Sequence, residues 1–171
     1  MKWKSLLCSL LFIVVFALAG CNQKDVQPVA IDEKTDKCAI CNMSVMDNQF
    51  ATEVVLENGK ALKFDDIGCM YNWMAENKDE KLLAKFVRDY DTKEWVELEK
   101  ATFVHDKSIK TPMAYNVVSF SDKKEAEQYI SEHQGELLTY DQLQQHKWEM
   151  NHDMDMHMEG EHSDTMEHDH E

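Results

Sequence analysis

The sequence is poor in basic residues. It holds 18 Lys and Arg against 33 Asp and Glu, which gives a formal net charge of −15 at pH 7. Nucleic acids and anionic membrane surfaces both favour basic partners, so we expect the chain to bind neither through its own surface charge. The acidity instead favours cations and keeps the protein soluble.

The chain also lacks an apolar run long enough to cross a bilayer. Its one long apolar stretch, residues 5–20, is shorter than the roughly 20 residues that a membrane span needs, which argues against a retained anchor. Lys2 and Lys4 precede this stretch, and it ends in Leu18-Ala19-Gly20-Cys21. This order is typical of a secretory signal peptide, and its last four residues resemble the lipobox of bacterial lipoproteins.

The lipobox predicts cleavage after residues 1–20 and a lipid on Cys21. The mature chain is then an extracytoplasmic lipoprotein, attached through this lipid anchor to the outer face of a membrane. Its net charge changes from −15 to −17, because the removed segment contains two lysines and no acid. Residues 21–36 are polar, contain Pro28 and show no convincing period, so we expect them to form a flexible tether.

Cysteine is scarce in the predicted mature domain. Cys8 leaves with the signal peptide and Cys21 is consumed by the lipid, which leaves Cys38, Cys41 and Cys69. An odd number in an exported protein argues against a purely structural disulfide framework. At least one thiol is therefore expected to be free or bound to a metal.

The C-terminal residues 149–171 differ from the rest in composition. They contain no aromatic and no branched aliphatic residue, so they cannot bury a core, and we expect a disordered acidic tail. A solvated spacer has no use for thioethers and imidazoles, whereas together these groups suit copper. We therefore interpret the tail as a metal buffer. Its candidate ligands are Met150, His152, Met154, Met156, His157, Met158, His162, Met166, His168 and His170.

The remaining residues, 37–148, alternate between strand and helix patterns. Two strands around Asn58-Gly59 form an expected hairpin, and Asp65 or Asp66 can cap a following helix. Met70 and Met74 lie at helical spacing and are interpreted as core residues. The expected elements are strands at 50–56, 61–64, 84–90, 95–104, 115–120 and 136–140, with helices after 65–66 and from 121–122 to about 133. This is an α+β pattern with a suspected internal duplication.

The sharpest motif is Cys38-Ala39-Ile40-Cys41-Asn42-Met43. A Cys-x-x-Cys pair allows a redox disulfide, half of a zinc site, or ligands for a soft metal. Zinc is the weaker choice, because Cys69 and His105 supply only a loose second pair. The redox interpretation expects the pair at the start of a helix, whereas here it precedes the hairpin. Thiolate and thioether together favour Cu(I).

The sequence resembles the NosL family, the copper-binding accessory lipoproteins of nitrous oxide reductase. The resemblance spans residues 37–145 and rests on the lipobox, Cys41-Asn42-Met43 in place of the usual Cys-Gly-Met, Phe50-Ala51, the segment from Phe64 to Met70, and Thr111-Pro112-Met113. It implies two small ββαβ-type modules similar to part of organomercurial lyase, with limits near 37–105 and 106–148. Asn42 departs from glycine, but Asn also adopts positive φ readily.

The resemblance implies a Cu(I) ligand set of Cys41, Met43 and Met113, with Cys38 as a further candidate. It also implies partners: a copper-loading machinery and an apo-cuproenzyme, nitrous oxide reductase. Cys69 is interpreted as a buried apolar thiol, His133 and His146 as surface residues, and His105 stays open. We expect a copper chaperone and not an enzyme. The alternatives are an extracytoplasmic thiol-disulfide oxidoreductase using Cys38 and Cys41, and a general metal-buffering lipoprotein.

Overall fold

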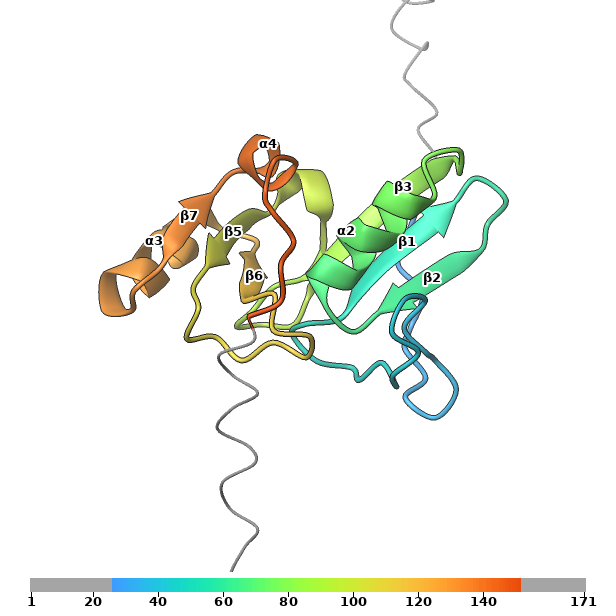
Figure 1. The fold of residues 1–171 in the computed structure, drawn as a ribbon, viewed down its shortest axis with the longest axis horizontal. Coiled ribbons are helices and arrows are strands. Elements are labelled where there is room, and N and C mark those ends of the chain that lie inside the picture. Colours follow the sequence, from blue (N-terminus) through green and yellow to red (C-terminus); the bar gives the residue numbers. More distant parts are fainter. Residues whose placement is uncertain (1–25, 152–171) are drawn as a thin grey trace, which may run out of the picture.

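The computed structural model describes residues 26–151, whose strands form two antiparallel sheets (Figure 1). The first sheet has the order β2-β1-β3-β4 and the second β6-β5-β7. The elements are β1 Thr52–Leu56, β2 Ala61–Phe64, α2 Ile67–Glu76, β3 Leu82–Arg88, β4 Trp95–Glu97, the 3₁₀ turn η1 Leu98–Lys100, β5 Thr102–His105, β6 Val117–Phe120, α3 Lys123–Glu132, β7 Glu136–Leu138 and α4 Tyr140–Leu143. The expected α+β class is confirmed.

The first hairpin follows directly from its sequence. All five residues of β1 are buried; four of them are apolar or β-branched, as is typical of a central strand, and the fifth is Glu53. Gly59 turns the chain at φ +85°, a conformation that costs glycine little. The register then pairs Thr52 with Phe64, so β2 ends beside the beginning of β1.

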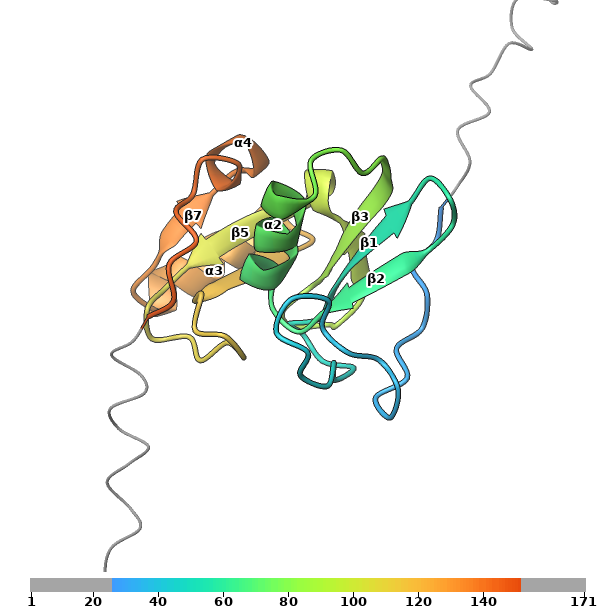
Figure 2. The same cartoon turned by 45° about the vertical axis from the view of Figure 1, so that its right-hand side comes forward.

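Helix α2 begins directly after this hairpin. Asp66 is its N-cap, and the Asp66 carboxylate accepts a hydrogen bond from the Gly68 N–H at 3.0 Å. Met70 is fully buried and Met74 packs against the same core, which confirms their interpretation as core residues. Figure 2 shows α2 standing between the two sheets, and it contacts β1, β2 and β6. The end of β2 and the first turn of α2 thus lie at the centre of the molecule.

The second sheet repeats the plan of the first. In each, the first strand lies in the middle, the second and third strands flank it, and a helix follows the second strand. Asp122 caps α3 as Asp66 caps α2. The suspected duplication is therefore present as two ββαβ units.

One expected strand, 95–104, is wrong. The chain forms β4 and then the 3₁₀ turn η1, and β5 belongs to the other sheet. Leu98 is buried at this turn, which anchors the crossover between the two sheets. The change of sheet thus precedes Thr102, a few residues before the expected module limit near 105.

Polar contacts join the two sheets at the end of β3. The Tyr90 N–H donates to the Ser119 carbonyl at 2.8 Å, and the Ser119 hydroxyl donates to the Arg88 carbonyl at 2.6 Å. The buried Asp89 carboxylate accepts the Ser121 N–H at 2.6 Å. The two units consequently share hydrogen bonds as well as a core.

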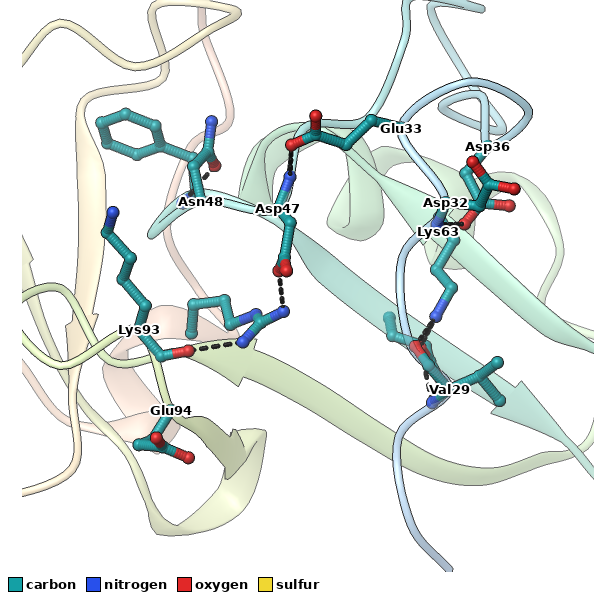
Figure 3. Close-up of polar contacts among 12 residues, drawn as sticks. Val29, Asp32, Glu33, Asp36, Asp47, Asn48, Lys63, Lys93 and Glu94 are labelled. Atoms are coloured by element: carbon teal, nitrogen blue, oxygen red, sulfur yellow. Dashed lines mark hydrogen bonds and ion pairs between the residues drawn. The ribbon is translucent and has the colours of Figure 1, made fainter.

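The expected tether is shorter than residues 21–36. The Val29 N–H donates to both oxygens of the buried Glu53 carboxylate, at 3.0 and 3.1 Å, and the Lys63 ammonium contacts Glu53 and the Val29 carbonyl (Figure 3). A buried ion pair needs further hydrogen-bond partners, and the Val29 backbone supplies them. The chain is thus held on the first sheet from Val29 onward. Residues 1–25, with the predicted signal peptide and Cys21, lie outside the described part.

The C-terminal segment packs over α2. Trp148 stacks on Tyr71 with ring centroids 4.6 Å apart, and the Asn151 N–H donates to the Ala114 carbonyl at 2.8 Å. Residues 149–151, assigned to the disordered tail by composition, are therefore held on the folded part. His152 and the later tail ligands lie outside the described residues. Within residues 26–151, we find no helix with the length and apolar character of a membrane span.

Candidate metal centre

The Cys-x-x-Cys segment forms a closed loop at the edge of the first sheet. The Asn42 N–H donates to the Cys38 carbonyl at 3.0 Å, and the Cys38 N–H donates to the Met43 carbonyl at 2.9 Å. Asn42 sits at φ +62°, which the sequence anticipated for the residue in place of glycine. The Ala39 N–H also donates to the Lys63 carbonyl at 3.0 Å, which ties the loop to β2.

Two further side chains approach this loop from the junction of β2 and α2. Asp65 follows the last residue of β2, and Cys69 is the third residue of α2. Because Asp66 caps the helix, Asp65 is left to point its carboxylate at the loop, where it accepts a hydrogen bond from the Cys41 thiol at 3.2 Å.

The four side chains of Cys38, Cys41, Asp65 and Cys69, here called the thiol cluster, lie together. One ligand atom from each lies within 4.8 Å of the others. Cys38, Asp65 and Cys69 are buried, whereas Cys41 is half-buried. No cysteine of residues 26–151 is in a disulfide. One oxygen of Asp65, Oδ1, is buried without a hydrogen-bond partner, as expected of a ligand that faces a metal ion.

Charge in the thiol cluster is concentrated on two groups. A hydrogen bond from Cys69 lowers the pKa of Cys38 to about 4, against the opposing effect of burial. The same contact raises the pKa of Cys69, and burial raises the pKa of Cys41 to about 12. Burial also raises the pKa of Asp65 to about 6. Near neutral pH the cluster therefore holds one thiolate and one carboxylate, and a bound cation would release the remaining thiol protons.

The loop 111–116 of the second unit reaches the same end of α2. The Met113 N–H donates to the Asp66 carboxylate at 3.0 Å, so Asp66 both caps α2 and holds this loop. Tyr115 lies directly on Gly68, where a Cβ atom would overlap the tyrosine ring. The Tyr115 hydroxyl accepts a hydrogen bond from the Asn72 side chain at 2.7 Å. The two units thus meet next to Asp65.

The structure brings together only some of the sequence-derived ligands. Cys41 and Cys38 lie in the thiol cluster, and Met113 is partly buried against the core cluster that also contains Cys38 and Cys69. Met43 is half exposed, at 50 %. Met150 is the one tail ligand within the described residues, and it lies beside His105 and His146, apart from the thiol cluster.

Sequence reasoning missed Asp65 and underrated Cys69. Cys69 is buried as expected. Its sulfur also belongs to the thiol cluster, and simple apolar packing would not require that position. Asp65 was considered only as a helix cap, a role that Asp66 fills. The available signal was a pair of adjacent acids, Asp65-Asp66, with Cys69 four residues after the first. One acid suffices for a helix cap, so the other was free for a second role.

The fold and the thiol cluster define a class of protein: a duplicated α+β domain with a sulfur-rich cluster suited to a soft metal ion. Residues 28–148 match the family model NosL, and the chain belongs to this family. The resemblance read from the motifs is thereby confirmed.

Two relatives illustrate the family. A copper-binding lipoprotein NosL of Stutzerimonas stutzeri is 25% identical over 147 residues, which are 78% of this chain and 77% of the relative. The crystal structure of the copper chaperone NosL from Shewanella denitrificans superposes with a TM-score of 0.60 at 23% identity, covering 67% of this chain and 93% of that one. The structural match supports the shared fold.

Proposed function

We propose that the chain is a lipid-anchored, extracytoplasmic Cu(I)-binding protein that acts as a copper chaperone and not as an enzyme. The observation that carries the proposal is the thiol cluster, in which three sulfur atoms and a carboxylate converge within 4.8 Å. The two NosL relatives, a copper-binding lipoprotein and a copper chaperone, support the choice of copper. The lipobox ending at Cys21 supports the anchor.

The donor set favours Cu(I) over harder ions. Thiolates and thioethers select Cu(I), whereas Mg²⁺ and Ca²⁺ require oxygen ligands. Met43 follows Cys41 by two residues, and the Met113 backbone is fixed to the capping residue next to Asp65. We propose that these thioethers complete the ligand set of Cys41 and Cys38, with Cys69 and Asp65 as additional donors from the core side.

The exposure of the ligands suits transfer of the ion. The exposed fraction is 3% for Cys38 and 0% for Cys69, whereas it is 50% for Met43. A partner can thus approach through Met43 and Cys41 and displace the ligands one at a time. We propose a copper-loading machinery and an apo-cuproenzyme, nitrous oxide reductase, as these partners.

The alternative function, a thiol-disulfide oxidoreductase, requires an accessible cysteine with a low pKa. Here the cysteine with the lowered pKa, Cys38, is the buried one, and burial raises the pKa of the more accessible Cys41. We therefore expect no turnover in an insulin-reduction assay of the reduced protein. Catalysed reduction that depends on Cys38 and Cys41 would favour the enzyme instead.

An anaerobic competition titration against a strong Cu(I) chelator tests the binding function. We expect one tight equivalent in the unmodified protein and a loss of at least 100-fold in affinity in Cys41→Ser. Met46→Leu is the matched control, because Met46 is exposed like Met43 but lies beyond the closed loop, and it should bind normally. Equal affinity of Cys41→Ser and the control would contradict the proposal.

A further inference from the structure

A second group of metal-ligating side chains lies in the other unit. His105 is the last residue of β5, His146 follows α4, and Met150 lies close to the end of the described chain. All three line a cavity of about 530 Å³, here called the His pocket. Its lining also holds two acids, Glu136 and Glu149, and two lysines, Lys107 and Lys147.

The two histidines are close enough to share one ion. Their ring centroids lie 5.0 Å apart with an interplanar angle of 60°. Imidazole nitrogens lie about 2.0 Å from a bound metal, so two rings on one ion have centroids roughly 4.5 to 6.4 Å apart. The observed separation falls within this range.

Aromatic packing alone does not explain the arrangement. His146 does contact the Trp148 ring edge-on, with centroids 4.9 Å apart, and this contact positions the imidazole. His105, however, is the last residue of the central strand β5 and is only half-buried, and Met150, which is 42% exposed, lines the same cavity. Burial lowers the pKa of both histidines, so both rings are neutral and able to bind a metal near pH 7.

Backbone hydrogen bonds link the segment after Met150 to the loop 111–116, which in turn contacts the start of α2. The Asn151 N–H donates to the Ala114 carbonyl at 2.8 Å, and Ala114 directly follows Met113. The Met113 N–H is in turn bound to Asp66, the neighbour of Asp65. Asn151, the last residue that the structure describes, is therefore held beside the Met113 loop.

We propose that His105, His146 and Met150 form a second, weaker site for a monovalent soft metal ion, at the root of the tail. Two imidazoles and one thioether suit Cu(I), and the absence of a thiolate makes this site weaker than the thiol cluster. The choice of Cu(I) rests on the function proposed above, whereas the site itself rests on the ring geometry of the two histidines and on the cavity that they share with Met150.

An anaerobic titration of the full mature chain with Cu(I), followed by NMR of labelled histidine rings and methionine methyl groups, tests this site. Assignments come from His105→Asn, His146→Asn and Met150→Leu. We expect the first equivalent to produce thiolate-to-copper absorption, and a later equivalent to shift His105, His146 and Met150 signals together. His133→Asn is the matched control, since His133 is exposed at the end of α3.

The outcomes separate the two proposals. If the first equivalent gives no thiolate absorption, the thiol cluster fails, whatever the histidines do. If thiolate absorption develops but the three signals stay unmoved while tail signals shift, the His pocket is a packing contact and the second site is overturned. The retained first equivalent in His105→Asn and His146→Asn shows that these variants are folded. Loss of the coupled shift in both variants, with none in His133→Asn, supports the site.

Discussion

At the scale of single residues, Asn42 sets the geometry of the cysteine loop. Its φ of +62° is accessible to Asn and Gly but strained for a β-branched residue. We expect Asn42→Gly to bind Cu(I) normally and to change the free energy of unfolding by only a few tenths of a kcal/mol. Asn42→Val should lower it by about 1–2 kcal/mol and weaken copper binding. Urea unfolding and chelator competition measure both. Normal binding by Asn42→Val would show that the turn does not position Cys41.

Asp65 is the residue at which stability and binding oppose each other. Burial raises its pKa to about 6, so ionising Asp65 costs stability in the metal-free fold. Below the pKa of Asp in the unfolded chain, about 4, Asp65 is protonated and the metal-free fold keeps its full stability. This stability is lost as the pH rises through about 6, the pKa of Asp65 in the fold.

We therefore expect Asp65→Asn to stabilise the metal-free protein by about 1 kcal/mol at pH 7 and by little at pH 4. The same change should weaken Cu(I) binding, because it removes an anionic donor. Urea denaturation at the two pH values, with chelator competition at pH 7, gives the answer. A variant that is less stable than the parent at pH 7 would show that the carboxylate is well accommodated without metal.

At the scale of elements, the contact between α2 and the loop 111–116 depends on Gly68. A Cβ atom at this position would overlap the Tyr115 ring, so Gly68→Ala must push the loop away. We expect a loss of about 2 kcal/mol in the free energy of unfolding, within the range for overpacked sites, and weaker Cu(I) binding through displaced Met113.

Gly59→Ala provides the control for this change. A Cβ atom there meets nothing within 4 Å, and only the positive φ is strained. It should lose about 1 kcal/mol of stability with normal copper affinity. Unchanged copper affinity in Gly68→Ala, measured beside this control, would separate the loop 111–116 from the metal site.

The elements themselves were largely predictable, because their signals are local. The Asn58-Gly59 hairpin, a helix cap at Asp65 or Asp66, another at Ser121 or Asp122, and the repeated ββαβ order follow from patterns within a few residues. The crossover at Leu98 was missed, since an apolar residue buried in a 3₁₀ turn gives the same pattern as one in a strand. The limits of the folded part were misjudged for a related reason: Val29 and Asn151 are held by partners far away in the sequence.

The candidate metal centre was predictable only in part. Cys38 and Cys41 form a recognisable motif, and Met113 entered through the family resemblance. Asp65 and Cys69 join the loop only because the first residues of α2 pack beside it, across 24 or more positions of sequence. The proximity of His105 and His146 likewise depends on the return of the chain after α4 to β5. Such contacts belong to the tertiary structure and leave no local pattern.

At the scale of the whole molecule, the lipid on Cys21 is expected to keep the protein at the membrane. Cys21→Ser removes the thiol that is predicted to receive the lipid, so this variant should accumulate as unprocessed precursor or appear as released protein. Membrane fractionation with mass spectrometry of the N-terminus detects either form. Fully processed, membrane-retained protein without lipid would contradict the predicted anchor.

The tail and the thiol cluster make different demands on the fold. A tail of His and Met needs no tertiary structure to bind copper, whereas the thiol cluster exists only when the loop, β2 and α2 come together. Truncation after Asn151 keeps every described contact. We therefore expect the truncated protein to retain one tight Cu(I) equivalent and to lose only weaker ones. This outcome also distinguishes a chaperone from a general metal-buffering lipoprotein.

The most direct test of the copper site combines this truncation with the double variant Cys41→Ser, Met113→Ala in the full chain. Both are titrated anaerobically with Cu(I) against a strong chelator. We expect the truncated protein to keep the tight equivalent and the double variant to lose it while keeping the weak ones, because a thiolate and a thioether have been removed. A truncated protein without the tight equivalent, or a double variant that retains it, would contradict the assignment.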